Sequence, residues 1–563
     1  MAPWTFHPEN DRWVERDGTY VRGRAVVDGE PRDADVLAEQ FARADTDRAF
    51  LAALERADGF YAVVSETGEG VRAGVDHVRS VPLYYADGYV SDSARWLRRQ
   101  LDDPTVDPVA EAEYLLTMYA TGPDTLYRSI RQLQAGEALL AGDGSIDTKW
   151  YFEYDPHGSL LDDRATLVDR LDDALVAAFE RTIAVADDRP IVVPLSGGYD
   201  SRLIVLMLRR LGYDDVRAVT YGRPEAPDVR VAEEVADRLD LPWQFVEYST
   251  EKWREWFDAS EREAYYRTVD DFDAIPNLAA WPAVRELRRR DAVPADAVFM
   301  PGQTAAGVGG HLPEWLPDRE QIAFDELIDY ALDTHYTLLD WDDPELAARF
   351  RGRLRQRIDA PEFGPPAAMA AAYERWEWRE RQSKFMTQDG RMYEFWGYDW
   401  WYPLFDPGFA EFWEGIPLAW RADKRLYEQY VEELYATVAG VDPTTAGRTQ
   451  DAADSLSDRL LTGVKSAVAD SPVAVPARSA YRWLQRRQDP RGEHPLGYLG
   501  MVPEEQFDRL YTGAESHHTF RTLEALGRIS FDPPDESGYP DEVSLDALER
   551  TRSERKEDVE ARK

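Results

Sequence analysis

The chain has 563 residues, enough for two or three domains, and 44% of them are hydrophobic, which supports ordinary cores. Its net charge of −41 disfavours broad nucleic-acid binding and indicates a protein that stays soluble at high salt, as in halophilic cells. The absence of cysteine excludes disulfides, thiolate zinc sites and a cysteine nucleophile. No stretch approaches the ~20 apolar residues that span a bilayer, and MAPWTFHPEN lacks a signal-peptide core, so we expect a cytoplasmic protein.

Short β-rich segments fill the chain from about residue 10 to 150. Examples are GTYVRGRAVVDG, GFYAVVSETGEGVRAGV and VPLYYADGYVSD, which are separated by Gly and Asp turns. Turn signals about every ten residues predict a sheet sandwich with few helices, in a domain over residues 1–155. Residues 152–165 have the composition of a linker, and a long helix is expected at 166–184.

Residues 196–201 read SGGYDS, between the apolar run 191–195 and a helical pattern at 202–212. Glycines allow close approach of the backbone to a ligand, and a helix N-terminus favours phosphate. The hydroxyls of Ser196 and Ser201 can donate to phosphate oxygens, whereas Asp200 cannot and therefore suggests a bridging magnesium ion. The plainer alternative is a glycine turn in which Asp200 and Ser201 cap the helix, but capping alone does not require all six residues.

The segment after this loop alternates between strand and helix. A strand is expected at 216–222, a helix at 229–241 and a strand at 243–249. This alternation predicts a doubly wound parallel sheet with ligands at the carboxyl ends of its strands. Beyond about residue 325 the pattern is helical and rich in aromatic residues. We therefore expect one second domain over residues 160–531, made of the parallel sheet and these helices, followed by a polar tail over 532–563.

Several motifs together resemble the class B asparagine synthetase family. LERADGFYAVV (54–64), VDHVRSVPLYY (75–85) and DTLYRSIRQLQAGEALL (124–140) resemble successive signatures of its glutaminase domain. SGGYDS is similar to its pyrophosphate loop, and GYDWWYPLFD (397–406) resembles the segment that follows its catalytic helices. The resemblance covers most of the chain. It implies α/β and α+β folds: an N-terminal-nucleophile-like β-sandwich domain, then a doubly wound PP-loop synthetase domain with a helical C-terminal part.

The resemblance also implies a reaction. In that family ATP and Mg²⁺ activate a carboxylate as an acyl-adenylate with release of pyrophosphate; an amine or ammonia then attacks, and AMP leaves. Aspartate is the default carboxylate, which would place the chain in asparagine biosynthesis. The family assigns the metal to Asp200 and the nucleotide contacts to Leu195, Ser196, Gly197, Gly198, Asp200, Ser201, Val219, Gly222 and Gly302.

Two departures from the family concern glutamine and magnesium. Glutamine-using members expose a cysteine nucleophile at position 2, where this chain has Ala2, so we expect a degenerate glutaminase domain with a structural role. The second family loop usually carries acids that help to hold magnesium. The corresponding stretch, MPGQTAAGVGGHLP at 300–313, has glycines and no carboxylate. Magnesium would then depend on Asp200, the ATP phosphates and water.

A third departure concerns a catalytic lysine that steadies the pyrophosphate. It is expected near 442–452, where the chain reads DPTTAGRTQDA and Arg448 is the nearest cation. Lys424 and Lys384 are the other candidates, and each could equally be a solvated or salt-bridged cation. Asp399 lies where the family tends to have a glutamate beside the reacting centre.

These departures leave alternatives open. The chain could be a catalytically reduced nucleotide-binding or scaffolding protein, or it could amidate a sugar acid or another small metabolite. A transfer-RNA thiolase that shares the loop is disfavoured by the acidic charge, the lack of cysteine and the sandwich domain. The expected partners are a small-molecule carboxylate and an amine or ammonia, with no nucleic acid and no membrane; a homodimer is left open.

Overall fold

The computed structural model describes residues 4–68, 70–142, 145–339, 341–440, 517–529 and 543–545, together with residues 496 and 548. It is a mixed α/β structure, with mainly antiparallel sheets in the N-terminal part and a parallel sheet in the middle of the chain. No helix within these residues is long and apolar enough to cross a membrane.

Two sheets that share a core make up the N-terminal part. Their strands are β1 (Thr5–His7), β2 (Val14–Arg16), β3 (Thr19–Val27), β4 (Glu30–Arg32), β5 (Ala57–Thr67), β6 (Gly70–Val75), β7 (Tyr84–Ala86), β8 (Tyr89–Ser91), β9 (Arg131–Gln132), β10 (Glu137–Gly142) and β11 (Ser145–Trp150). The larger sheet has the order β11-β10-β6-β5-β3-β2 with β4 beside β3, and the smaller has the order β1-β8-β7-β9. Phe6 and Val90 from the smaller sheet pack with Val64 and Leu139 from the larger one, so the sheets lie face to face.

This part contains more helix than the sequence pattern predicts. Its helices are α1 (Ala34–Ala42), α2 (Asp47–Leu54), α3 (Ala94–Gln100) and α4 (Pro108–Thr117). Each begins behind a residue whose side chain accepts a backbone N–H, namely Asp33, Thr46, Ser93 and Asp107. Helices α1 and α2 cover the outer face of the larger sheet, where Phe41 packs on both Phe50 and Tyr61. The central strand β5 is therefore buried on both faces, and this explains why its sequence is a continuous apolar run and does not alternate.

A five-stranded parallel sheet forms the centre of the second part. Helix α5 (Arg164–Ala186) leads into it, and its order is β14 (Trp243–Glu247), β13 (Val216–Gly222), β12 (Ile191–Pro194), β15 (Val298–Phe299) and β18 (Asp399–Trp400). Helix α6 (Tyr199–Arg210) connects β12 to β13, and α7 (Pro227–Arg238) connects β13 to β14. The predicted parallel sheet is confirmed. Its apolar strands pack against α5 and α6 in the largest core of the described chain.

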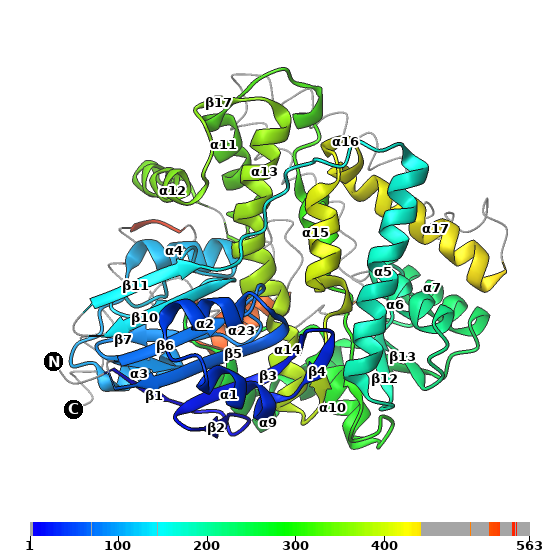
Figure 1. Ribbon diagram of the computed structural model, residues 1–563, viewed down its shortest axis with the longest axis horizontal. Coiled ribbons are helices and arrows are strands. Elements are labelled where there is room, and N and C mark those ends of the chain that lie inside the picture. Colours follow the sequence, from blue (N-terminus) through cyan, green and yellow to red (C-terminus); the bar gives the residue numbers. More distant parts are fainter. Residues whose placement is uncertain are drawn as a thin grey trace.

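Helices make up most of the remainder. They are α8 (Thr250–Phe257), α9 (Ser260–Val269), α10 (Trp281–Arg289), α11 (Phe324–His335), α12 (Pro344–Arg357), α13 (Pro366–Glu377), α14 (Asp389–Phe395), α15 (Pro407–Gly415), α16 (Leu418–Arg421), α17 (Arg425–Ala439) and α23 (His517–Ala525). The other elements are short 3-10 helices, a π-helical stretch and a small hairpin. The 3-10 helices are η1 (Ala305–His311), η2 (Leu316–Asp318), η4 (Met386–Gln388), η5 (Pro403–Phe405) and η6 (Ala422–Lys424). The π-helical stretch is η3 (Trp378–Phe385), and the hairpin pairs β16 (Ile322–Ala323) with β17 (Phe363–Gly364). Figure 1 shows α11, α12 and α13 gathered at one end, with the N-terminal strands and α5 to α7 on opposite sides.

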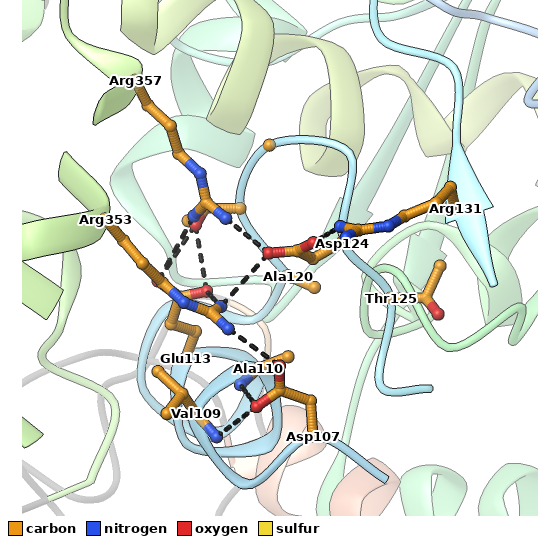
Figure 2. A network of polar contacts seen from close by, with 12 residues as sticks. Asp107, Val109, Ala110, Glu113, Ala120, Asp124, Thr125, Arg131, Arg353 and Arg357 are labelled. Carbon is orange, nitrogen blue, oxygen red and sulfur yellow. Dashed lines mark hydrogen bonds and ion pairs between the residues drawn. The ribbon is translucent and has the colours of Figure 1, made fainter. Parts of the chain in front are cut away.

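Charged side chains join the N-terminal part to the helical part. Arg353 of α12 donates to Glu113 Oε2 at 2.7 Å and to Asp107 Oδ2 at 3.0 Å, and Arg357 donates to Asp124 Oδ2 at 2.5 Å (Figure 2). Glu113 is fully buried. Because a buried charge is tolerated only when it is paired, this network fixes α12 against α4 and the loop that follows it.

Candidate functional site

The SGGYDS segment lies between β12 and α6, at the carboxyl end of the central strand of the parallel sheet. Ser196 N donates to Ser201 Oγ at 3.0 Å, and the two hydroxyl oxygens lie 3.1 Å apart. Gly198 is the residue before α6 and provides no side-chain cap. The first N–H groups of the helix therefore have no capping side chain, which leaves them free to donate to a phosphate.

Two glycines of the site allow close packing. A Cβ on Gly197 would lie 2.5 Å from Asp228 Oδ1 at the start of α7, and a Cβ on Gly302 would lie 3.1 Å from Ser201 N. Gly302 follows β15 and brings the second loop against the N-terminus of α6. The structure thus places Gly302 beside Ser201, where the sequence comparison expected a nucleotide contact.

The remaining predicted nucleotide residues lie on the same edge of the sheet. Leu195 N donates to Val219 O at 2.8 Å, and Thr220 Oγ1 donates to Leu195 O at 2.8 Å. Gly222 ends β13 with a φ of 142° and accepts a hydrogen bond from Tyr248 N at 2.7 Å. These contacts make the ends of β12, β13 and β14 one continuous rim next to the loop.

Asp200 lies in the first turn of α6, facing a cation. Lys424 Nζ is 3.8 Å from Asp200 Oδ2, with both side chains partly buried. Burial raises the pKa of Asp200, while the Lys424 ammonium and the Tyr427 hydroxyl lower it. Asp200 Oδ1 is buried and accepts no hydrogen bond of normal geometry from the described part of the chain. An ionised oxygen in that position suits a metal ion or a further donor.

Lys424 reaches this place because the backbone bends sharply in front of α17. Asp423 and Lys424 both have left-handed backbone angles, with φ of 56° and 52°. The Lys424 side chain runs over Gly310 of η1, where an added Cβ would lie 3.4 Å from Lys424 Cε. Since Gly310 belongs to the second loop, both loops and the start of α17 meet at Asp200.

Lys384, another predicted catalytic cation, lies in a different environment. Its Nζ donates to Ala120 O at 2.9 Å, to Gly122 O at 2.7 Å and to Glu380 Oε2 at 2.6 Å, and the side chain is fully buried. Burial lowers its pKa to about 8. An ammonium group has three N–H donors, and all three are used here. We therefore correct the expectation for Lys384 and assign it to packing between the two parts of the chain.

Asp399 also lies away from the loop. It begins β18, at the amino end of the parallel sheet, and forms ion pairs with Arg12, Arg24 and Arg189. These arginines hold the pKa of Asp399 below its usual range despite burial. The structure does not bring Asp399 together with SGGYDS, because the loop leaves the opposite, carboxyl edge of the sheet. Arg448 and the 442–452 segment lie outside the described residues.

One cluster of polar side chains at this edge was missed by sequence reasoning. Gln303 follows Gly302 and donates from Nε2 to Asp389 Oδ2 at 2.8 Å, and Asn277 Nδ2 donates to Asp389 Oδ1 at 3.1 Å. Burial raises the pKa of Asp389 to about 6. No local pattern marks these residues, since they come from three segments far apart in sequence.

One family model matches the part of the chain that contains this site. Residues 170–427 match the family model for asparagine synthase, so this part of the chain is an asparagine synthase domain. A search of curated proteins found no significant match. Among solved structures, glutamine phosphoribosylpyrophosphate amidotransferase from B. subtilis, complexed with ADP and GMP, is 10% identical with a TM-score of 0.17. That match covers 52% of this chain and 63% of the other, and the likeness is too weak to support an argument about fold or function.

Proposed function

We propose that this protein is an ATP-dependent ligase that activates a carboxylate as an acyl-adenylate and forms an amide with ammonia or another amine. The family supports an ATP-dependent carbon–nitrogen ligase in general. The observation that carries the finer proposal is the meeting of the SGGYDS loop with Lys424, whose Nζ lies 3.8 Å from Asp200 Oδ2. A loop of donors beside a lysine suits a reaction in which charge builds on departing pyrophosphate.

Each group has a separate task in this proposal. The hydroxyls of Ser196 and Ser201 and the first N–H groups of α6 donate to the pyrophosphate oxygens. Lys424 offsets the charge that develops on those oxygens as the α-phosphorus is attacked. Leu195 and Val219 of the rim, together with Gly302 of the second loop, hold the adenosine part through backbone groups.

Magnesium fits this site only as a companion of ATP. Among the described residues, no group of three or more His, Cys, Asp or Glu side chains could hold a metal ion. Asp200 Oδ1 is a buried carboxylate oxygen that accepts no hydrogen bond of normal geometry in that part of the chain, which suits one metal ligand. Mg²⁺ commonly keeps several waters and binds through one carboxylate and substrate phosphates. A magnesium ion bound to Asp200 would neutralise part of the negative charge of the ATP phosphates.

Glutamine has no evident role in this proposal. The printed sequence contains no cysteine, so no thiolate can attack a glutamine amide. We propose free ammonia or another amine as the nitrogen source and a structural role for the N-terminal part. The expected carboxylate is aspartate, in a cytoplasmic reaction at high salt.

The test is pyrophosphate release with a panel of acids, ammonia and Mg-ATP in molar salt. The parent should release pyrophosphate with at least one acid, and Ser201→Ala with Asp200→Asn should abolish that release. Ser145→Ala, at an exposed serine of β11, is the matched control and should behave as the parent does.

A reduced, nucleotide-binding role is the second candidate. It is favoured by the second loop, where Gln303 and Thr304 stand in a segment without any carboxylate. If the parent binds Mg-ATP but no acid triggers pyrophosphate release, this second candidate replaces the ligase.

A further inference from the structure

Strand β11 is the last strand of the larger N-terminal sheet and has a neighbouring strand on one side only. It pairs with β10, and no other strand or backbone group of the described residues bonds to its outer edge. Five large hydrophobic side chains are exposed in this part of the protein, and two of them, Ile146 and Trp150, belong to β11. An exposed edge strand with apolar side chains favours pairing with a strand of another chain.

The ladder between β10 and β11 determines which backbone groups face outwards. Tyr151 N, directly after β11, donates to Gly136 O at 3.0 Å, in the register of the six pairs of the ladder. Antiparallel pairs alternate between hydrogen-bonded and non-hydrogen-bonded ones, so the odd-numbered residues of β11 bond to β10. The N–H and C=O groups of the even-numbered residues, Ile146, Thr148 and Trp150, therefore point to the outer edge.

A second copy of β11 fits this edge in an antiparallel, two-fold symmetric register centred on Thr148. In this register Thr148 lies opposite its own copy, and Ile146 lies opposite Trp150 of the second copy. Each of these pairs joins even-numbered residues, so all the outward N–H and C=O groups bond across the edge. The two apolar side chains contact each other in both symmetric positions, which adds cross-strand packing.

The charges of β11 favour this register over its neighbours. Asp147 and Lys149 are about half exposed and form an ion pair within the strand, with Nζ 2.7 Å from Oδ2. When the centre is Thr148, each of the two acids lies opposite a lysine, at a non-hydrogen-bonded pair where side chains are closest. A shift of the centre by one residue would place either Asp147 or Lys149 opposite its own copy, and opposed like charges are unfavourable.

The balance of charge also distinguishes β11 from the rest of the surface. The chain has 107 acidic and 66 basic residues, so most of its surface repels a second copy. Strand β11 contains one acid and one base and therefore has no net charge. Two copies can approach each other here without the repulsion that other surfaces impose.

We infer that β11 is a self-association surface through which two copies of this chain form a two-fold symmetric dimer, with their larger sheets joined into one continuous sheet. Six residues from each copy make a small interface, so the dimer is weak, with a Kd of roughly micromolar or above. Figure 1 shows β11 and α6 on opposite sides of the molecule. Activity and Tm measured below that concentration therefore do not depend on the pairing.

Sedimentation velocity over a wide range of protein concentration tests the association. The parent should pass reversibly from monomer to dimer. Lys149→Glu places acids opposite each other in both symmetric positions and should weaken the dimer roughly 10-fold at moderate salt, and less at molar salt, where charges are screened. Adding Asp147→Lys to this variant restores opposite charges and should recover parental association. Arg43→Glu, at an exposed arginine of α1 paired with Glu39, changes the net charge equally and should have no effect.

Disulfide cross-linking tests the register. The printed sequence contains no cysteine, so Thr148→Cys introduces a single thiol into each chain. Opposed residues of a hydrogen-bonded antiparallel pair have Cα atoms about 5.5 Å apart, which a disulfide spans. Mild oxidation should therefore link two copies of Thr148→Cys. It should not link Ser145→Cys, because its two copies would lie about 20 Å apart along the paired strands.

Three results would overturn the inference. The first is a parent that stays monomeric at the highest soluble concentrations. The second is a dimer that Lys149→Glu does not weaken at moderate salt, because such a dimer forms through another surface. The third is equal cross-linking of Thr148→Cys and Ser145→Cys, which would show random collision and no fixed register.

Discussion

Lys424→Met separates a catalytic role for this lysine from a structural one. The side chain is 22% exposed, and its Nζ lies 3.8 Å from Asp200 Oδ2. At that separation the attraction is about 4 kcal/mol for an effective dielectric constant near 20, before desolvation and side-chain entropy are subtracted. Measured net values for accessible pairs fall to about 1 kcal/mol or less. Methionine keeps the apolar stem over Gly310, so we expect a loss of stability of about 1 kcal/mol at most.

The effect on the reaction should be much larger. Removing one group that stabilises developing charge typically costs ~2.7–4 kcal/mol, which is ~100- to 1000-fold in rate. We therefore expect Lys424→Met to lower kcat for pyrophosphate release by that factor while the Kd for Mg-ATP changes little. The assay is single-turnover pyrophosphate release in molar salt, with calorimetric Kd and Tm on the same preparation.

The control is Lys149→Met, which removes an exposed lysine paired with Asp147 at 2.7 Å. It should leave kcat, Kd and Tm near the parental values, because exposed pairs contribute little. A parental kcat for Lys424→Met would refute the assignment and direct attention to Arg448. A fall in Tm large enough to explain the lost activity would make Lys424 a structural residue.

Three further predictions concern other parts of the molecule. Lys384→Met should lower the free energy of unfolding by about 3–5 kcal/mol in denaturant titrations, because Glu380 is left buried and unpaired; the exposed Lys149→Met should not. Burial raises the pKa of Glu414 to about 7 from 4.5, so the folded state binds this proton more tightly and stability should fall as pH rises from about 4.5 through 7. Glu414→Gln should flatten that slope, which is at most ~1.4 kcal/mol per pH unit, and an unchanged slope would contradict the assignment. Glutamine should yield no glutamate in preparations free of contaminating glutaminase, at any concentration.

The parts of the fold that follow a local pattern could be predicted from sequence. Helix α5 extends two residues beyond each end of the predicted 166–184, and β13 has the predicted bounds 216–222. Both have regular apolar spacing, and the glycines of SGGYDS mark the turn between β12 and α6. The short helices α1 to α4 were harder to predict, because seven to ten residues give too few turns to show a period against neighbouring strands.

The choice between lysines could not be made from sequence. Lys384 lies in ERQSKFM and Lys424 in RADKRLYEQY, and both are flanked by charged residues typical of a solvated helix. Burial of Lys384 results from contact with a loop more than 250 positions earlier. The position of Lys424 results from two consecutive residues with left-handed backbone angles before α17. Neither is a glycine, so the sequence gives no signal for this conformation. Contacts between distant segments and rare backbone angles cannot be predicted from the local pattern of residues.

The same buried charges join the N-terminal part to the second part of the chain. Arg79 donates to Asp273 at 2.7 Å with both side chains buried, and Lys384 is held by the carbonyls of Ala120 and Gly122. Asp124 and Glu113 likewise lie between Arg353 and Arg357 (Figure 2). Removing one partner of a buried pair costs about 3–5 kcal/mol, whereas the free energy of unfolding of a whole domain is only about 5–15 kcal/mol. Loss of the N-terminal part would leave several such charges unpaired at once, so the second part depends on it for stability.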